Sequence, residues 1–240
     1  MAQRNDKHRL PPFEHNGILL VDKPSEWTSH DVVNFVRRRF NVKKVGHAGT
    51  LDPAATGLLV LLLGKATKMS QVLSQSDKTY SGEMLFGVET DSQDMDGTVI
   101  AENDATFLTE EMVLEAFESF VGAQTQIPPM VSAVKVGGKK LYELARKGKT
   151  IEREPREMEI FSLVVKAFHL PVVSFEVECT KGTYVRTLAS DIGTKLGCGG
   201  VLKSLRRLRS GEYDVATAHD VEIMRENWSQ DDLLQALVAF

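Results

Sequence analysis

The chain has 240 residues, of which 42% are hydrophobic and 26% are charged, a composition typical of a globular protein with one main domain. Two cysteines and no Cys-x-x-Cys pair argue against a disulfide framework and against a structural zinc site. No apolar run approaches the roughly 20 residues of a membrane-spanning helix, and residues 1–15 are polar without a signal-peptide core, so we expect a cytoplasmic protein.

The net charge is −4, but the charges are segregated along the chain. Between Lys78 and Lys135 there are eleven Asp or Glu residues and no Lys or Arg. Basic residues gather in three clusters: Arg37–Arg39 with Lys43 and Lys44, Lys135–Arg153, and Lys203–Arg209. Such segregation can supply a local basic face for nucleic acid, although each cluster could equally be the solvated face of a helix.

The N-terminal part predicts a mobile segment, a strand and a helix. We expect residues 1–15 to form a mobile tail and Ile18–Asp22 to form a short apolar strand. Ser29 is a suitable N-cap for the helix that follows, because its hydroxyl can accept a hydrogen bond from an early backbone N–H. Apolar residues at spacing i, i+4, i+8 would share one face of this helix: Val32, Val36 and Phe40.

The segment Gly46–Gly57 is predicted to be a rigid loop that carries one carboxylate, Asp52. Its glycines permit unusual backbone conformations, and Pro53 fixes its own φ and pushes Asp52 toward an extended conformation. A continuous apolar run, Leu58–Leu63, follows at once and is long enough for a fully buried strand. Asp52 is therefore expected at the entrance to a core strand, on the stiff support that a catalytic group requires.

The middle of the chain predicts three further elements. We expect a helix over Lys65–Gln75 with Met69, Val72 and Leu73 facing inward, and then a strand over Tyr80–Val88 with one apolar face. The acidic segment Asp91–Gly97 lacks the spacing and terminal glutamate of an EF-hand. We therefore expect a turn with Gly97 at a positive φ, and no calcium site.

A helix is expected after Thr109, which can cap it, and Gly122 should end it. The stretch from about 124 to 156 is basic and interrupted by Gly and Pro. It includes a predicted turn at Gly137-Gly138 and a short predicted helix over 141–148. We expect this stretch to be a protruding insertion.

The C-terminal half predicts two strands, Glu159–Phe168 and Val172–Cys179, and a helix that Thr183 caps and Gly197 stops. Residues 214–240 are acidic and weakly patterned, and we expect only a short C-terminal segment there. Strands dominate the middle of the chain, and helices are interspersed without strict βαβ alternation. This pattern predicts an α+β domain with a mixed sheet.

Standard cofactor and hydrolase signatures are missing from the sequence. Gly64-Lys65-Ala66 has the wrong upstream spacing for a P-loop, and neither HExxH nor GxSxG occurs. The six histidines show no metal-ligand spacing, so we expect no metal and no cofactor. Cofactor-free chemistry at one carboxylate remains, and a carboxylate can act as a nucleophile or as a base.

The segment Gly46–Gly57 resembles the catalytic motif of the TruB family of tRNA pseudouridine synthases, G-H-x-G-x-L-D-P-x-A-T-G. Four further segments occur in the family's order and at similar spacing: Gly17–Pro24, Asp77–Tyr80, Lys181–Arg186 and Leu205–Leu208. The resemblance implies a catalytic domain over 16–213 with a central mixed, mainly antiparallel β-sheet flanked by helices. It also implies a thumb-like loop over about 124–156 that folds over RNA, and too few residues after 213 for a full RNA-binding PUA domain.

The resemblance further implies isomerisation of the T-loop uridine of tRNA, position 55, to pseudouridine after the base has been flipped out of the RNA. Asp52 would be the catalytic carboxylate, Arg186 would be the partner of its charge, and Tyr80 would stack on the base. The other implied support residues are Tyr184, Leu205 and Lys23. The residues implied to contact RNA or uracil are His47, Lys65, Lys68, Asp94 and Arg207.

Two alternatives remain open from the sequence. A non-catalytic RNA-binding or RNA-folding module would need the basic clusters but not Asp52 and Arg186 together. A guide-dependent pseudouridylase subunit is disfavoured, because no C-terminal RNA-binding domain is recognisable. We expect instead a monomeric isomerase that acts on the T stem-loop of tRNA, without a guide RNA, an obligatory protein partner or a membrane.

Overall fold

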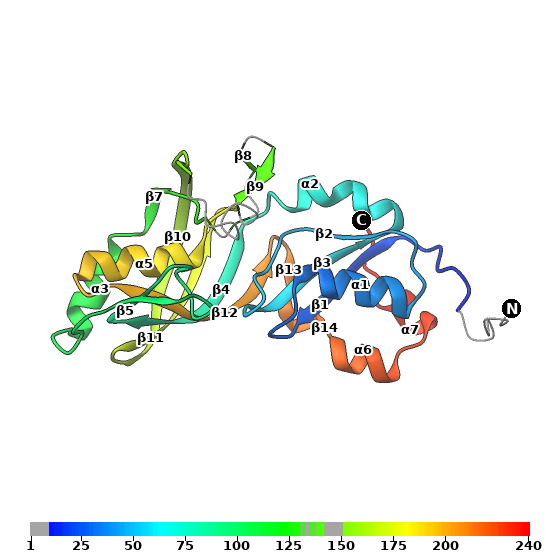
Figure 1. Cartoon of the computed structure of the whole chain (residues 1–240). Helices are drawn as coiled ribbons and strands as arrows, with labels where there is room; N and C mark the ends of the chain where they lie inside the picture. Colours follow the sequence, from blue (N-terminus) through cyan, green and yellow to red (C-terminus); the bar gives the residue numbers. More distant parts are fainter. Residues whose placement is uncertain (1–9, 131, 133–134, 137, 142–150) are drawn as a thin grey trace, which may run out of the picture. The chain divides into compact units, whose positions relative to one another are not determined.

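The computed structural model describes residues 10–130, 132, 135–136, 138–141 and 151–240 (Figure 1). Contacts between backbone segments divide the chain into two units. Unit 1 contains the residues up to Ser76 together with Arg206–Phe240, and unit 2 contains Asp77–Leu205. Strand β12 (Gly200–Ser210) runs through the boundary after Leu205 and pairs with strands of both units.

In unit 1 the strands follow the order β14-β1-β3-β12, with β2 paired to β3 and β13 paired to β12. The β1–β14 and β3–β12 pairs are parallel, whereas β1–β3, β2–β3 and β12–β13 are antiparallel. The strand bounds are β1 Gly17–Lys23, β2 Val45–His47, β3 Thr56–Leu63, β13 Tyr213–Asp214 and β14 His219–Asp220. The helices are α1 Ser29–Arg39, α2 Ser70–Leu73, α6 Val221–Asn227 and α7 Gln230–Gln235, with 3-10 turns at Gly64–Met69 and Val215–Thr217.

Strand β3 is buried along most of its length because both faces of the sheet in unit 1 are covered. Alternate residues of β1 and β3, among them Leu19 and Leu61, pack with apolar residues of α1, α6 and α7. The intervening residues, among them Leu20 and Val60, pack with Ala66 of the first 3-10 turn. This cover on two sides explains a continuous apolar run instead of an alternating pattern, and it confirms the predicted buried strand.

Helix α1 is capped by Thr28, so the prediction of Ser29 as the N-cap is wrong. The Thr28 hydroxyl accepts from the backbone N–H of Asp31, and the Asp31 carboxylate accepts from the backbone N–H of Thr28, a reciprocal capping box. Ser29 is buried, and its hydroxyl bonds instead to the backbone of Leu51. The predicted apolar face is confirmed, because its three residues are fully buried: Val32, Val36 and Phe40.

Gly57 lies near the start of β3, where its φ of 97° falls in the left-handed region that favours glycine. A Cβ added to Gly57 would stand 2.3 Å from the backbone carbonyl oxygen of Arg207 on β12. Gly57 is also directly opposite Arg207 in the parallel pairing of the two strands. The glycine therefore lets β3 and β12 approach closely just after the Asp52 loop.

We expect Gly57→Ala to lower the free energy of unfolding by at least about 2 kcal/mol, because it adds backbone strain and a clash with the β12 backbone. Urea denaturation followed by circular dichroism measures this loss. Gly122→Ala is the matched control, since Gly122 has a similar φ of 98° but no atom within 4 Å of an added Cβ. Equal destabilisation by both substitutions would assign the effect to φ alone.

Two other predictions for unit 1 are wrong. The helix predicted over Lys65–Gln75 is a 3-10 turn followed by the four-residue helix α2. Val72 is 61% exposed, whereas Leu73 packs against the apolar core as predicted. Only Ala66 of the turn is buried, so little apolar burial is available to stabilise a longer helix. Phe13, within the predicted mobile tail, is buried, and its N–H donates to the Asn41 carbonyl. Residues 1–9 of that tail lie outside the described residues.

In unit 2 the strands follow the order β12-β4-β11-β10-β7, and the β4–β11, β11–β10 and β10–β7 pairs are antiparallel. Helices α3 (Glu110–Glu118) and α5 (Val185–Leu196) lie against each other and share an apolar core with this sheet (Figure 1). The strand bounds are β4 Lys78–Phe86, β5 Val88–Thr90, β6 Val99–Glu102, β7 Gly122–Gln126, β8 Lys135–Val136, β9 Lys139–Lys140, β10 Arg156–His169 and β11 Val172–Cys179. The predicted α+β class with a mixed, mainly antiparallel sheet is confirmed.

The acidic segment between β5 and β6 is a turn, as predicted, but its positive φ belongs to Gln93 (68°) and not to Gly97. Gly97 serves another purpose, since a Cβ there would lie 2.2 Å from the Ser92 hydroxyl oxygen. The same turn is tied to β12, because the Leu202 N–H donates to the Gln93 carbonyl at 3.0 Å. Tertiary contacts therefore fix the position of Asp94, the residue that follows.

Helix ends in unit 2 differ from the predictions in two places. Helix α3 ends at Glu118, and Gly122, the predicted end, begins β7. Helix α5 follows Tyr184 as N-cap, and the Thr183 hydroxyl donates to the Thr180 carbonyl at 2.9 Å instead of capping the helix. The predicted end of α5 is confirmed: Gly197 takes the left-handed conformation.

The predicted insertion over about 124–156 is only partly within the described residues. Strands β8 and β9 form a hairpin there, with Gly138 at a φ of 80° in its turn. Gly137 and most of the helix predicted over 141–148 fall outside the described residues. Among the helices that the structure describes, none is long and apolar enough to cross a membrane.

Candidate active site

Asp52 lies on the loop between β2 and β3, and its side chain is exposed. The loop is fastened at Leu51, whose N–H donates to the Ser29 hydroxyl at 2.9 Å and whose carbonyl accepts from that hydroxyl at 3.1 Å. Ser29 belongs to the first turn of α1, so a helix fixes the residue before Asp52. The Ala55 N–H donates to the Asp52 carbonyl at 3.1 Å and closes the following turn. Asp52 thus has the fixed backbone that a catalytic side chain requires.

Lys23, which the sequence placed among the support residues, ends β1 with a fully buried side chain. Its ammonium donates to the carbonyl oxygens of Pro24, Trp27 and Pro53 at 2.8, 2.5 and 3.0 Å. These bonds engage all three hydrogens of the ammonium group. Because Pro53 directly follows Asp52, Lys23 holds the loop just after Asp52, whereas Ser29 holds it just before, at Leu51.

Burial lowers the pKa of Lys23 to about 8, against the opposing effect of the Asp52 carboxylate. Between about pH 8 and the ordinary value of 10.5, the unfolded chain keeps a proton on Lys23 that the folded chain has lost. The contribution of Lys23 to the free energy of unfolding therefore rises as the pH rises from about 8 to 10.5. Between these two pH values, we expect the free energy of unfolding of the wild-type protein to rise by up to about 3 kcal/mol relative to that of Lys23→Met. Urea denaturation of both proteins at several pH values measures the difference, and a difference independent of pH would contradict the prediction.

Arg207 was predicted to contact RNA phosphates, but its side chain is only 1% exposed in this structure. Its Nε donates to the Leu58 carbonyl at 2.7 Å, and its terminal nitrogens donate to the Thr50 and Gly49 carbonyls at 3.4 and 3.2 Å. These carbonyls lie on both sides of Asp52 in the sequence. The buried guanidinium therefore ties together the two ends of the loop that carries Asp52.

Three further residues of unit 1 were predicted to contact RNA. His47 ends β2, and burial lowers the pKa of its imidazole, which favours the neutral ring. Lys65 and Lys68 are exposed on the 3-10 turn Gly64–Met69. Residues three apart in a 3-10 helix lie above one another, so the two lysines share one face. Their contact with RNA phosphates stays a prediction.

In unit 2, Arg186 lies in the first turn of α5 and is buried. Its Nη1 stands 3.2 Å from Asp94 Oδ2, and the Tyr184 ring centroid lies 5.8 Å from its Cζ. Asp94, predicted to lie near RNA, therefore directs its carboxylate at Arg186. The pairing compensates the buried guanidinium and fixes its direction.

Gln126 is a positioning residue that the sequence did not reveal. It is buried at the end of β7, where its amide oxygen accepts from the Tyr184 N–H at 2.8 Å and its amide nitrogen donates to the Tyr184 carbonyl at 3.0 Å. Gln126 thus satisfies both backbone polar groups of Tyr184, the residue at which α5 begins. The Thr187 hydroxyl likewise donates to the Gln93 side-chain oxygen at 2.7 Å and joins the acidic turn to α5. A single glutamine before a proline-rich break gives no recognisable signal in one sequence.

Tyr80 and Leu205 are half-buried on β4 and β12 and pack against the apolar core of unit 2. Within unit 2 the structure thus brings Arg186, Asp94 and Tyr184 together, and within unit 1 it gathers Lys23 and Arg207 around the Asp52 loop. The pairing of Arg186 with Asp52 and the stacking role of Tyr80 stay predictions. In the described part of the chain, no three His, Cys, Asp or Glu side chains are grouped as metal ligands.

The fold matches two solved structures in which the similar chain belongs to a larger complex. A chain of a Cbf5-Nop10-Gar1 complex matches with a TM-score of 0.72 at 27% identity, covering 99% of this chain and 66% of that chain. A chain of an H/ACA RNP bound to a substrate RNA containing 2'-deoxyuridine matches with a TM-score of 0.65 at 26% identity, covering 88% of this chain and 52% of that chain. One of these similar chains is thus found in a complex with a substrate RNA, and the fold places this chain in the same structural class.

Two family models match almost the whole chain. The TruB family pseudouridylate synthase (N terminal domain) matches residues 37–185, and the tRNA pseudouridylate synthase B C-terminal domain matches residues 186–239. The tRNA pseudouridine synthase B of Opitutus terrae is 51% identical over 208 residues, 87% of this chain and 86% of that protein. That of Syntrophotalea carbinolica is 50% identical over 207 residues, 86% of this chain and 68% of that protein. The chain belongs to the TruB family of pseudouridylate synthases.

Proposed function

We propose that this chain isomerises the T-loop uridine at position 55 of tRNA to pseudouridine. The observation that carries the proposal is the family's aspartate, Asp52, on a loop that Ser29, Lys23 and Arg207 hold through its backbone. The names of relatives about 50% identical over most of the chain support the same activity. A non-catalytic RNA-folding module would not need such rigid support for one exposed carboxylate.

The reaction breaks the bond between uracil N1 and ribose C1′ and forms a bond between C5 and C1′. The C5 hydrogen leaves as a proton and N1 gains a proton, so atoms and charge balance. Asp52 acts as a nucleophile or as a base in this exchange. Its fixed backbone limits the orientational freedom that the carboxylate must lose before reaction.

The substrate base must leave its stack in the RNA, which costs a few kcal/mol. We propose that Tyr80 stacks on the flipped base and that Tyr184 and Leu205 line its pocket. His47 would lie near the place that the base vacates, and Lys65 and Lys68 would contact phosphates. The Arg186 guanidinium, which Asp94 orients within unit 2, would stabilise negative charge at the reacting carboxylate.

We further propose that the enzyme works in the cytoplasm as a monomer, on the T stem-loop, without cofactor, guide RNA or obligatory protein partner. The relatives named tRNA pseudouridine synthase B support a tRNA substrate. A related solved chain lies in a complex with Nop10 and Gar1, so the absence of partners requires a direct test.

The test is tritium release from a tRNA transcript labelled at uracil C5, with the purified chain and no guide RNA. Isomerisation leaves the mass of the RNA unchanged but frees the C5 hydrogen. We expect release that maps to the T loop by pseudouridine-specific chemistry. Binding of tRNA without release would favour the RNA-folding module, and release only after addition of a guide RNA would favour the guide-dependent subunit.

A further inference from the structure

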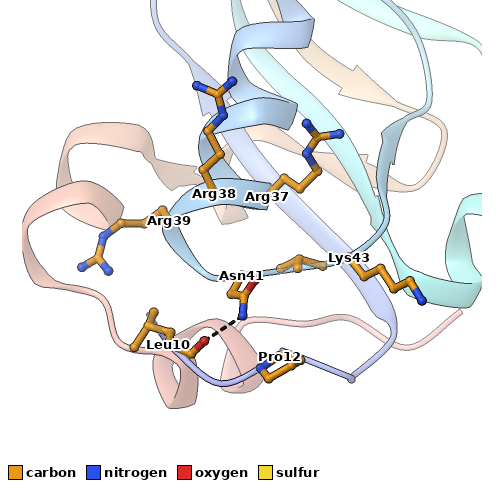
Figure 2. Close-up of a pocket in the computed structure, with 8 residues that line it drawn as sticks. Leu10, Pro12, Arg37, Arg38, Arg39, Asn41 and Lys43 are labelled. Carbon is orange, nitrogen blue, oxygen red and sulfur yellow. Dashed lines mark hydrogen bonds between the residues drawn. The ribbon is translucent and has the colours of Figure 1, made fainter. Parts of the chain in front are cut away.

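A cavity of about 700 Å³ opens where helix α1 ends, and four cationic side chains line it (Figure 2). Arg37 and Arg38 extend from the last turn of the helix, and Lys43 extends from the segment after it. The lining residues are Leu10, Pro12, Arg37, Arg38, Arg39, Asn41, Val42 and Lys43. No carboxylate occurs among these described lining residues, so the cavity is strongly positive.

One of the four cations has a structural task. Arg39 donates to the carbonyls of Arg225 and Trp228 at 3.3 and 2.9 Å and so holds α1 against the C-terminal end of α6. Arg37, Arg38 and Lys43 are exposed, and none forms an ion pair with a residue that the structure describes. These three charges are therefore available to a ligand.

The helix end alone does not explain this cluster. Cations in the last turn interact favourably with the helix dipole, and this explains the presence of Arg37 and Arg38. Each stabilises the helix by about 0.3–1 kcal/mol. Lys43 lies beyond the helix and reaches the cavity because the chain turns at Asn41, whose φ is 49°. The Asn41 side chain donates to the Leu10 carbonyl at 2.7 Å and fixes this turn (Figure 2). The third charge is thus placed by tertiary structure.

We infer that this cavity, which we call the α1 pocket, binds backbone phosphates of the tRNA at a second contact apart from the catalytic loop. Ser29 in the first turn of α1 holds the Asp52 loop, whereas the pocket lies at the last turn, about 15 Å away along the helix. Guanidinium and ammonium groups without carboxylate partners are the groups that recognise phosphate. The inference rests on the proposed function for the identity of the RNA.

The test compares Arg38→Gln/Lys43→Gln with the wild-type protein in tRNA binding titrations over a range of salt concentrations. We expect tRNA affinity at about 0.1 M salt to fall roughly tenfold. The slope of log K against log salt should become shallower by about 2, because each lost phosphate contact lowers the magnitude of this slope by about 0.9. The kcat for C5 tritium release at saturating tRNA should stay unchanged, since the pocket lies at the far end of α1 from the Asp52 loop.

Two control variants distinguish phosphate binding in the α1 pocket from a general effect of the protein's charge. Lys166→Gln/Lys195→Gln removes the same number of charges from exposed positions in unit 2, and we expect it to leave the salt slope unchanged. Arg38→Lys/Lys43→Arg keeps both charges and should retain most of the affinity. The inference would be refuted if both Gln pairs lost the same tRNA affinity, or if Arg38→Gln/Lys43→Gln lost none.

The binding titration also separates this inference from the proposed function. Wild-type protein that binds tRNA without C5 tritium release would refute the activity, while the salt slopes would still decide the pocket. Wild-type protein that fails to bind tRNA would overturn both.

Discussion

Replacing Asp52 with asparagine should reduce tritium release from C5-labelled tRNA by at least about 1,000-fold. The amide has nearly the shape of the carboxylate but is neither a nucleophile nor a base at neutral pH. The backbone of the loop is held at Leu51 and Pro53 through bonds that do not involve the Asp52 side chain. The substitution should therefore remove the chemistry and leave the loop in place.

The same variant should bind tRNA with an affinity within about threefold of wild type, because a single side chain contributes little to a contact dominated by phosphates. Asp231→Asn removes one negative charge from an exposed position in the first turn of α7 and should keep full activity. Equal turnover by Asp52→Asn would refute the assignment of Asp52. Loss of binding in parallel with loss of turnover would make Asp52 a binding residue.

Arg207→Met should lower the free energy of unfolding by about 3–5 kcal/mol, because it leaves up to three backbone carbonyls without their donor. Methionine has a similar length, so the loss would come from hydrogen bonding and not from a large cavity. With the two ends of the Asp52 loop no longer joined, kcat should also fall by at least about tenfold. Urea denaturation and single-turnover tritium release measure the two effects.

The neighbouring residue supplies the matched control. Arg206 also carries a guanidinium on β12, but it is half-exposed and pairs with the Asp22 carboxylate at 2.9 and 2.6 Å. Arg206→Met should cost no more than about 1 kcal/mol, as exposed ion pairs do. If Arg207→Met instead weakened tRNA binding and its salt dependence while kcat stayed constant, Arg207 would be a phosphate contact as first predicted.

The sequence alone predicted the structure correctly where a local pattern of residues is compatible with only one arrangement. The run Leu58–Leu63 has to be buried, and burial of every residue requires cover on both faces, which β3 has. The spacing of Val32, Val36 and Phe40 fixed the inward face of α1, and Gly197 fixed the end of α5. The loop with Asp52 was recognisable because its motif consists of side chains and glycines that follow one another in the chain.

Tertiary structure decided which polar side chains hold that loop. Ser29 was a plausible cap from its position, yet its hydroxyl bonds to Leu51, and Thr28 caps the helix. Arg207 lies in a basic stretch that predicts a surface, yet its guanidinium is buried against carbonyls roughly 150 residues away in the sequence. The acceptors of Lys23 and Arg207 are backbone carbonyls, which every residue possesses. Such bonds leave no signature in residue type or spacing, and only the folded chain shows which carbonyls they reach.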